Sequence, residues 1–335
     1  MITYALNLVI YFFIDLILVL SVNLQLGLLG IANLGFMLFM GLGGYLGALL
    51  SMGPNSSVAL QHYFFGATLP FPLPMIGGIL LGMLVGLGVG YLVLTNMRGH
   101  YLAIMTLAVF MIGYTFLQGV VPIVNGENGL YNIPQPLSAI AGAGHFSYQW
   151  EFAVLAGLLA ILSFWFCQRV IHSPFGRAAK AVRENESGAE ALGKNPFRIR
   201  LIVMVAAAGL TALAGVLMAQ YVTAWSPPAW SLTEIFPAMA ALIVGGRGNN
   251  WGAALGTFVI YILVGQGIGF IPIMANNPNA EYAIQWTIFG ALVVAFLWFR
   301  PAGLIPERKA RWPERTSHRQ ATSPPMSHVE EATHG

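Results

Sequence analysis

The chain has 335 residues, of which 57% are hydrophobic and only 8% charged, and its formal net charge is +3. A soluble domain carries roughly 25% charged residues, so this composition excludes an ordinary soluble protein. Apolar runs at 73–95, 201–222 and 282–299 approach or exceed the ~20 residues that a helix needs to cross a bilayer. The sequence therefore predicts an all-α integral membrane protein.

Residues 1–50 are apolar and contain no Lys or Arg. They can hold two spans, at about 3–22 and 31–50, or a re-entrant piece around "LGLLGIANLG", and no basic residue decides between these readings. Asp15 lies within this region, and a carboxylate at the bilayer centre costs about 2.5–3.5 kcal/mol on insertion scales. Asp15 is therefore a functional candidate, unless it is protonated or paired with another subunit.

Seven further spans follow in chain order, at 73–95, 100–121, 150–168, 201–222, 232–246, 250–270 and 282–299. The whole chain is expected to form a polytopic bundle of about eight to ten transmembrane helices. The span 232–246 is short and is interpreted as a broken helix, a feature that often marks a transport path. Four glycines recur at every fourth position in the first of these spans and predict close helix packing: Gly78, Gly82, Gly86 and Gly90.

The basic residues are concentrated in two segments. Residues 169–200 hold seven of them and the stretch from Arg300 onward holds six, which together are 13 of the 15 Lys and Arg residues. Short loops rich in Lys and Arg stay in the cytoplasm, so both segments are expected on that side. Residues 1–300 are then one transmembrane domain, and residues 301–335 are interpreted as a disordered cytoplasmic tail.

The segment "GAEALGK", residues 188–194, fits the spacing of a phosphate-binding P-loop, but Asn195 stands where a P-loop needs Ser or Thr. A working P-loop also follows a strand, whereas "FGRAAKAVREN" is composed of helix formers. Gly193 can end a short helix in the left-handed conformation, and Asn195 can cap the next helix with Pro196 at its first position. The segment is therefore predicted to be a short charged helical element that binds no nucleotide.

The stretch "SPFGRAAKAVRENESGAEALGKNPFRIRL" resembles the cytoplasmic EAA-type loop of permease subunits of bacterial ABC importers. Together with "AGLTALAGVLMAQYVTAWSP", "ALIVGGRGNNWGAALG" and "RGHYLAIMTLA", in the same order, the chain resembles M-type branched-chain amino acid permeases over roughly residues 5–305. This resemblance implies a permease that binds no cofactor itself. Its expected partners are ATP-binding ATPase subunits, a second and paralogous permease, a periplasmic binding protein and the bacterial inner membrane, with no nucleic acid.

The resemblance also implies roles for individual residues. The coupling helix that contacts the ATPase would contain Glu186, Ala189, Glu190 and Gly193, and the loops 122–148 and 223–231 would meet the binding protein. Candidates for the translocation path are Asn23, Asn33, Phe36, Tyr101 and Thr106. For the polar members of this set, the alternative is a hydrogen bond to a neighbouring helix.

The chain departs from the family at two positions, which affects the substrate more than the fold. Phe36 replaces the usual His or Gln, and Asp15 lies where the family is normally uncharged. A permease for urea or short amides shares the same motifs, and an ion-coupled secondary transporter would use Asp15 without an ATPase. An enzyme is not expected, since the chain shows no Ser/His/Asp set, no HExxH motif and no clustered metal ligands.

Overall fold

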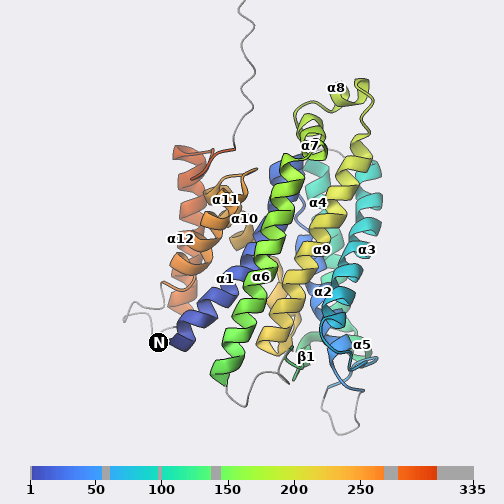
Figure 1. Ribbon diagram of the computed structural model, residues 1–335, viewed down its shortest axis with the longest axis vertical. Coiled ribbons are helices and arrows are strands. Elements are labelled where there is room, and N and C mark those ends of the chain that lie inside the picture. The colour runs from blue at the N-terminus through green and yellow to red at the C-terminus, as the bar shows by residue number, and fades with distance from the viewer. Residues whose placement is uncertain (1, 55–60, 97–99, 137–144, 268–277, 308–335) are drawn as a thin grey trace, which may run out of the picture.

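Helices running along one common direction make up most of the computed structural model, which describes residues 2–54, 61–96, 100–136, 145–267 and 278–307 (Figure 1). The first half contains the helices α1 (Ile2–Val22), α2 (Phe36–Ser51), α3 (Leu73–Asn96), α4 (His100–Gly119), α5 (Val121–Val124) and α6 (His145–His172). The second half contains α7 (Pro174–Glu184), α8 (Glu186–Ala191), α9 (Pro196–Val222), α10 (Ile235–Gly245), α11 (Asn250–Thr257) and α12 (Pro278–Phe299).

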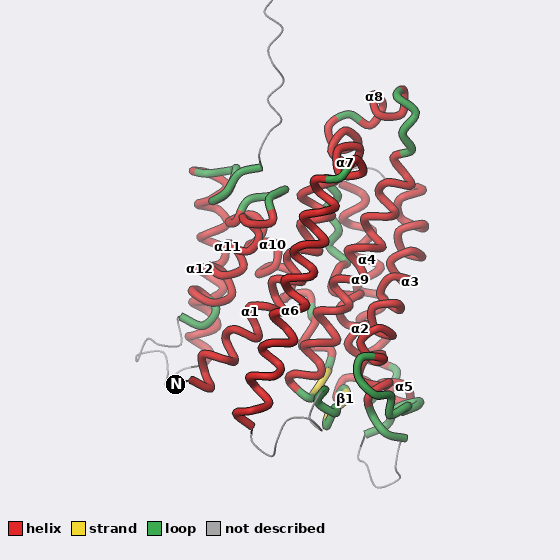
Figure 2. Tube along the Cα trace, in the orientation of Figure 1, coloured by secondary structure: helices red, strands yellow, loops and turns green. Residues whose placement is uncertain are grey.

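Shorter elements complete the chain. Two π-helices, η1 (Asn23–Leu28) and η5 (Phe258–Val264), extend α1 and α11, and three 3₁₀ turns are η2 (Gly126–Asn128), η3 (Pro227–Trp230) and η4 (Leu232–Glu234). The strands β1 (Leu130–Tyr131) and β2 (Ala224–Trp225) form one antiparallel pair. Helices α7 and α8 project at one end of the bundle, here called the α8 end, and the strand pair lies at the other, the β1 end (Figures 1 and 2).

Six apolar segments are long enough to cross a membrane, and three shorter apolar helices, 36–51, 250–264 and 283–299, accompany them. The predicted all-α polytopic membrane fold is confirmed. Helices α3, α4, α6, α9 and α12 correspond to predicted spans. The predicted span 232–246 overlaps the candidate span Pro227–Gly245, in which the 11-residue α10 reaches spanning length only together with the 3₁₀ turns that precede it.

Helices α2, α3 and α9 pack together because small residues line their contacts. Gly78 lies against Val216, Gly82 against Ala212 and Gly86 against Ala208, so the glycine stripe of α3 faces α9 along its length. A Cβ at Gly86 would lie 2.5 Å from the Ala208 Cβ. Since lipid tails are as apolar as the side chains, such close packing is what holds membrane helices together. The predicted stripe is confirmed.

The C-terminal segment corrects one prediction. Residues 301–307, assigned from the sequence to a disordered tail, are instead bound to the bundle: Leu304 N donates to Val244 O at 2.8 Å and Ile305 N to Gly245 O at 2.9 Å. These bonds satisfy carbonyls that the end of α10 would otherwise leave without partners. The remainder of the predicted tail, 308–335, lies outside the described residues.

Candidate translocation path and coupling element

The first span does not connect directly to the second. Helix α1 continues as the π-helix η1, Gly30 turns the chain at a φ of 69°, and residues 30–35 are not helical before α2 begins at Phe36. This interruption lies inside the bundle beside α4 (Figures 1 and 2). Two apolar helices thus flank a broken segment within residues 1–50. Irregular backbone at membrane depth is tolerated only where protein buries it or where it lines a cavity.

Buried polar side chains hold the interrupted segment. Asn33 Nδ2 donates to Gln25 Oε1 at 2.7 Å, and Asn33 Oδ1 accepts from Gly35 N at 2.8 Å. Thr106 Oγ1, on α4, accepts from Leu34 N at 3.1 Å. The amide nitrogen of Gln25 is buried and has no hydrogen-bond partner among the described residues.

Asn23 connects this interruption to a second one. Its Oδ1 accepts from Gly248 N at 2.9 Å, and its Nδ2 donates to Asn250 Oδ1 at 2.8 Å. Gly246, at a φ of 118°, ends α10, and the turn that follows leads into α11. Asn23 therefore hydrogen-bonds to a neighbouring segment. Such a bond was the alternative considered for the polar candidates of the translocation path.

The remaining path candidates have different surroundings. Phe36 is fully buried at the start of α2, whereas Tyr101 is 72% exposed on α4, so Tyr101 does not lie with the polar cluster. Asp15 is buried in α1 and makes no hydrogen bond or ion pair within the described part of the chain.

An aromatic cluster fills the bundle between the interruption and the β1 end. Trp230 is fully buried, and its ring centroid lies 5.0 Å from that of Tyr114 and 6.1 Å from those of Phe110 and Tyr45. Phe110 and Tyr114 follow Thr106 at spacings of four and eight residues, so all three share one face of α4. Trp230 belongs to the loop between α9 and α10, which therefore reaches into the bundle.

The loops at the β1 end are joined to one another. Strand β1 pairs with β2, so residues 122–136 of the loop 122–148 lie at the same end of the molecule as the loop 223–231. Both loops were predicted to meet a binding protein, and residues 137–144 of the first lie outside the described residues. Trp225 Nε1 donates to Gly41 O at 3.0 Å and anchors this surface to α2.

The helical element at the α8 end has the helix end at Gly193 and the cap at Asn195 that the sequence predicts, together with a cap at Asn185 that the sequence analysis did not identify. Asn185 caps α8 by accepting from Gly188 N at 2.9 Å, Gly193 ends the element at a φ of 75°, and Asn195 caps α9 by accepting from Arg198 N at 3.0 Å. Pro196 is the first residue of α9. The segment with P-loop spacing thus follows the helix α7 and not a strand, as expected from its composition.

An ion pair fixes α8 to α9. Arg200 donates from Nη1 to Glu186 Oε1 at 2.9 Å and from Nη2 to Glu186 Oε2 at 3.1 Å, which is the two-point geometry of a strong arginine–carboxylate pair. Ala189 is buried beneath the helix, while Glu190 is exposed and Leu192 is 81% exposed. Glu186 and Ala189 therefore position the element, and Glu190 and Leu192 form its free surface.

A second set of ion pairs joins α7 to the C-terminal segment. Lys180 Nζ lies 2.7 Å from Glu307 Oε1, and Arg183 Nη2 lies 2.9 Å from Glu307 Oε2. Arg183 also donates from Nη1 to Gly27 O in η1. We call Lys180, Arg183 and Glu307 the clamp, since they connect α7, the start of the interruption and residues 301–307.

Sequence reasoning missed Gln25, Arg183, Arg200 and Glu307. Gln25 could have been found, because it is an amide in an otherwise apolar run, two residues after Asn23. Arg183 and Arg200 were counted only among the seven basic residues of 169–200, and Glu307 was not singled out. The partner of Arg183 lies 124 residues away and that of Arg200 lies 14 residues away, so neither pair leaves a local sequence pattern.

Interrupted spans around buried polar groups, with a charged helical element projecting at one end, are the architecture of a membrane transport protein. Comparison with known proteins agrees with this class. The chain belongs to the family described as the permease component of the branched-chain amino acid transport system, whose family model matches residues 4–297.

Curated relatives extend over most of the chain. It is 27% identical over 320 residues to the probable branched-chain amino acid transport permease protein LivM of Methanocaldococcus jannaschii, covering 86% of this chain and 89% of that protein. It is 29% identical over 313 residues to the high-affinity branched-chain amino acid transport system permease protein LivM of Escherichia coli, covering 88% of this chain and 68% of that protein. The LivM protein of Salmonella typhimurium is 28% identical over 313 residues. No solved structure matches.

Proposed function

We propose that this chain is a transmembrane permease subunit of an ABC importer for branched-chain or related amino acids. A periplasmic binding protein delivers the substrate, and separate ATPase subunits drive transport. Family membership supports the assignment to an amino acid transport system. The element α7–α8, which ion pairs hold against the bundle, supports the proposal that separate ATPase subunits drive transport. In this proposal the α8 end is cytoplasmic and the β1 end faces the binding protein in a bacterial inner membrane. A second, paralogous permease completes the pathway.

The observation that carries the coupling role is the exposed tip of α8. Glu190 is exposed and Leu192 is 81% exposed on an element that projects beyond the other helices (Figure 1), so this surface is available to another protein. Leu192 and Glu190 would enter the ATPase, while the Glu186–Arg200 pair holds the tip rigid against α9. Coupling would depend on a rigid connection between the ATPase and α9. Glu186 would keep α8 in position through its ion pair with Arg200, and Glu190 would contact the ATPase directly.

Co-purification of the ATPase subunits with variants of the full complex tests this role. Leu192→Asp should reduce ATPase recovery strongly while the permease still inserts, because a carboxylate would replace the apolar contact. Arg247→Asp is the control, since Arg247 is exposed in the turn after α10 and lies outside α7–α8. Normal ATPase recovery and transport with Leu192→Asp would contradict the coupling role of this segment.

The chemistry around the interruption supports a net-neutral substrate. Gln25, Asn33 and Thr106 offer amide and hydroxyl groups without net charge, and the surrounding side chains are apolar. A strongly charged solute would lose hydration there without gaining a counter-charge. In this proposal the Gln25 amide nitrogen, which is unpaired among the described residues, would donate to a carboxylate or carbonyl oxygen of the substrate.

Uptake into vesicles that contain the whole complex distinguishes the substrates. Leucine should enter, whereas glutamate and lysine should not, and Gln25→Leu should slow leucine uptake more than it reduces the amount of folded permease. Uptake of urea without leucine would favour the related permeases for urea or short amides.

The unpaired carboxyl group of Asp15 supports one alternative, an ion-coupled secondary transporter. Such a transporter would work without ATPase subunits. Leucine uptake driven by a proton or sodium gradient in vesicles that contain only the permeases, abolished by Asp15→Asn, would favour that alternative over the importer.

A further inference from the structure

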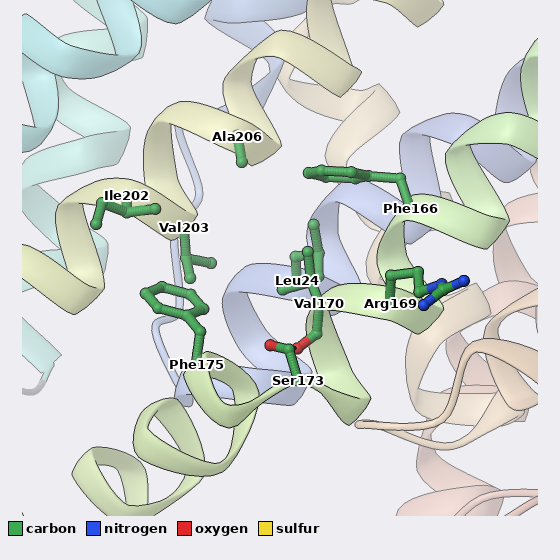
Figure 3. A pocket seen from close by; sticks show the side chains of 9 residues that line it. All are labelled: Leu24, Phe166, Arg169, Val170, Ser173, Phe175, Ile202, Val203 and Ala206. Atoms are coloured by element: carbon green, nitrogen blue, oxygen red, sulfur yellow. The ribbon is translucent and has the colours of Figure 1, made fainter.

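A groove opens between α6 and α9 near the α8 end. Its volume is about 410 Å³, within the ~300–1,000 Å³ of sites that hold small molecules. The lining is almost entirely apolar, with Leu24 of η1 at its floor and side chains of α6, α7 and α9 around it: Phe166, Phe175, Ile202, Val203 and Ala206 (Figure 3). Arg169 is the one charged residue of the lining and lies at its edge (Figure 3).

The groove has unpaired positive charge at its rim. Of the basic residues in 169–200, Lys180, Arg183 and Arg200 pair with carboxylates, whereas Arg169 pairs with none in the part of the chain that the structure describes. The Arg169 guanidinium instead stacks on the Trp165 ring at 5.0 Å. Arg198 is exposed and precedes Ile202 and Ala206 by four and eight residues, so it lies on the groove face of α9.

The depth of the groove matches the boundary of a bilayer. Ile202 and Ala206 follow the start of α9 by six and ten residues, or about 9 and 15 Å along the helix. Trp165 and Arg169 lie in the last two turns of α6, where aromatic and basic side chains meet lipid headgroups. The apolar part of the groove thus faces acyl chains, and its charged rim faces headgroups.

We propose that this groove is a binding site for one anionic phospholipid. An acyl chain lies along Phe166, Ile202 and Ala206, and the phosphate is held by Arg169 and Arg198. Lipid tails are as apolar as the groove, so chain contacts alone cannot favour one lipid over another. Selection therefore depends on headgroup charge. Because Phe175 belongs to α7, a bound lipid would also brace the element that leads into α8.

Native mass spectrometry of the full-length protein, titrated with phosphatidylglycerol or phosphatidylcholine, tests the site. We expect one phosphatidylglycerol molecule to be retained in preference to phosphatidylcholine. Arg169→Gln or Arg198→Gln should each weaken its binding about fivefold, the factor that corresponds to the attraction of one basic residue to an anionic lipid surface. Arg247→Gln is the matched control, because it removes an exposed arginine of the same end outside the groove, and it should change nothing.

A second variant distinguishes the contribution of the apolar groove to lipid binding from that of the two arginines. Ile202→Trp fills the groove while both arginines remain, and it should abolish retention of the single phosphatidylglycerol. Equal retention of both lipids, or equal weakening by Arg247→Gln, would identify ordinary boundary lipid and overturn the proposal. Cross-linking of a cysteine at position 202 to the second permease in the assembled complex would also overturn it, since the groove would then be a subunit interface.

Discussion

Thr106 shows how one hydroxyl group supports the interrupted segment. Its Oγ1 accepts from Leu34 N and donates to Ala103 O at 2.9 Å, so it serves both the interruption and its own helix. Thr106→Val would leave Leu34 N without this acceptor, and an unpaired buried donor costs about 1–3 kcal/mol. We expect Thr106→Val to lower the thermal stability and to slow transport. Thr106→Ser keeps the hydroxyl group and should have the stability and the transport rate of the unmodified protein.

The single cysteine provides the measurement. Cys167 is fully buried, so a thiol-reactive fluorophore reports the temperature at which the purified protein unfolds. Equal unfolding temperatures for Thr106→Val and the unmodified protein would show that the hydroxyl group is dispensable.

Gly86 and Gly88 offer a matched pair on one helix. A Cβ at Gly86 meets Ala208 of α9, whereas a Cβ at Gly88 has no atom within 4 Å. Gly86→Leu should therefore force α3 and α9 apart and destabilise the protein by about 1–3 kcal/mol, and Gly88→Leu should be close to neutral. The Cys167 assay measures both. Similar losses for the two variants would mean that helix propensity or lipid contact, and not packing, determines the effect.

Among the elements, α7 is tied to two other segments through the clamp, η1 and residues 301–307. Glu307→Gln removes the charge that holds Lys180 and Arg183, and the expected loss of stability is about 1 kcal/mol, because these side chains are only partly buried. The larger effect should be on coupling, since α7 would lose its connection to residues 301–307. We expect fewer amino acid molecules transported per ATP hydrolysed in the reconstituted complex.

The exposed Glu184 is the control for this experiment. It lies 3.9 Å from Arg183, at the outer limit of an ion pair, so Glu184→Gln should leave the ratio of transport to hydrolysis unchanged. An unchanged ratio with Glu307→Gln would limit the clamp to a structural role.

The elements differ in how far the sequence predicts them. The caps at Asn185, Gly193 and Asn195 were predictable because each acts on residues at most four positions away. The interruption at 30–35 could only be suspected, since Thr106 lies 72 residues from Leu34. The clamp could not be predicted at all, because Arg183 and Glu307 are 124 residues apart and a basic segment looks the same whether it is solvated or paired.

For the whole molecule, the positions of its two ends in the membrane are the main prediction. Asn128 is exposed at the β1 end and Ser187 at the α8 end. In intact cells, an impermeant thiol reagent should label Asn128→Cys and not Ser187→Cys, because in the proposed orientation the basic residues keep the α8 end in the cytoplasm. The buried Cys167 should not react. Labelling at position 187 and not at position 128 would show that the α8 end lies outside the cell. The proposed contact of α8 with an ATPase would then be impossible. Position 276, a further site for such labelling, lies outside the described residues.

The bound C-terminal segment has a consequence for the way the protein is made. A ribosome delivers the chain from its N-terminus, so α7 and the end of α10 are complete well before Leu304, Ile305 and Glu307 emerge. Until then Lys180 and Arg183 lack their carboxylate and the last α10 carbonyls lack their donors. The contacts of Leu304, Ile305 and Glu307 therefore form last during biosynthesis, and they close this end of the bundle. An ATPase that recognises the closed end would engage the permease only after residues 301–307 have bound, so a chain stalled directly after α12 would remain unassembled.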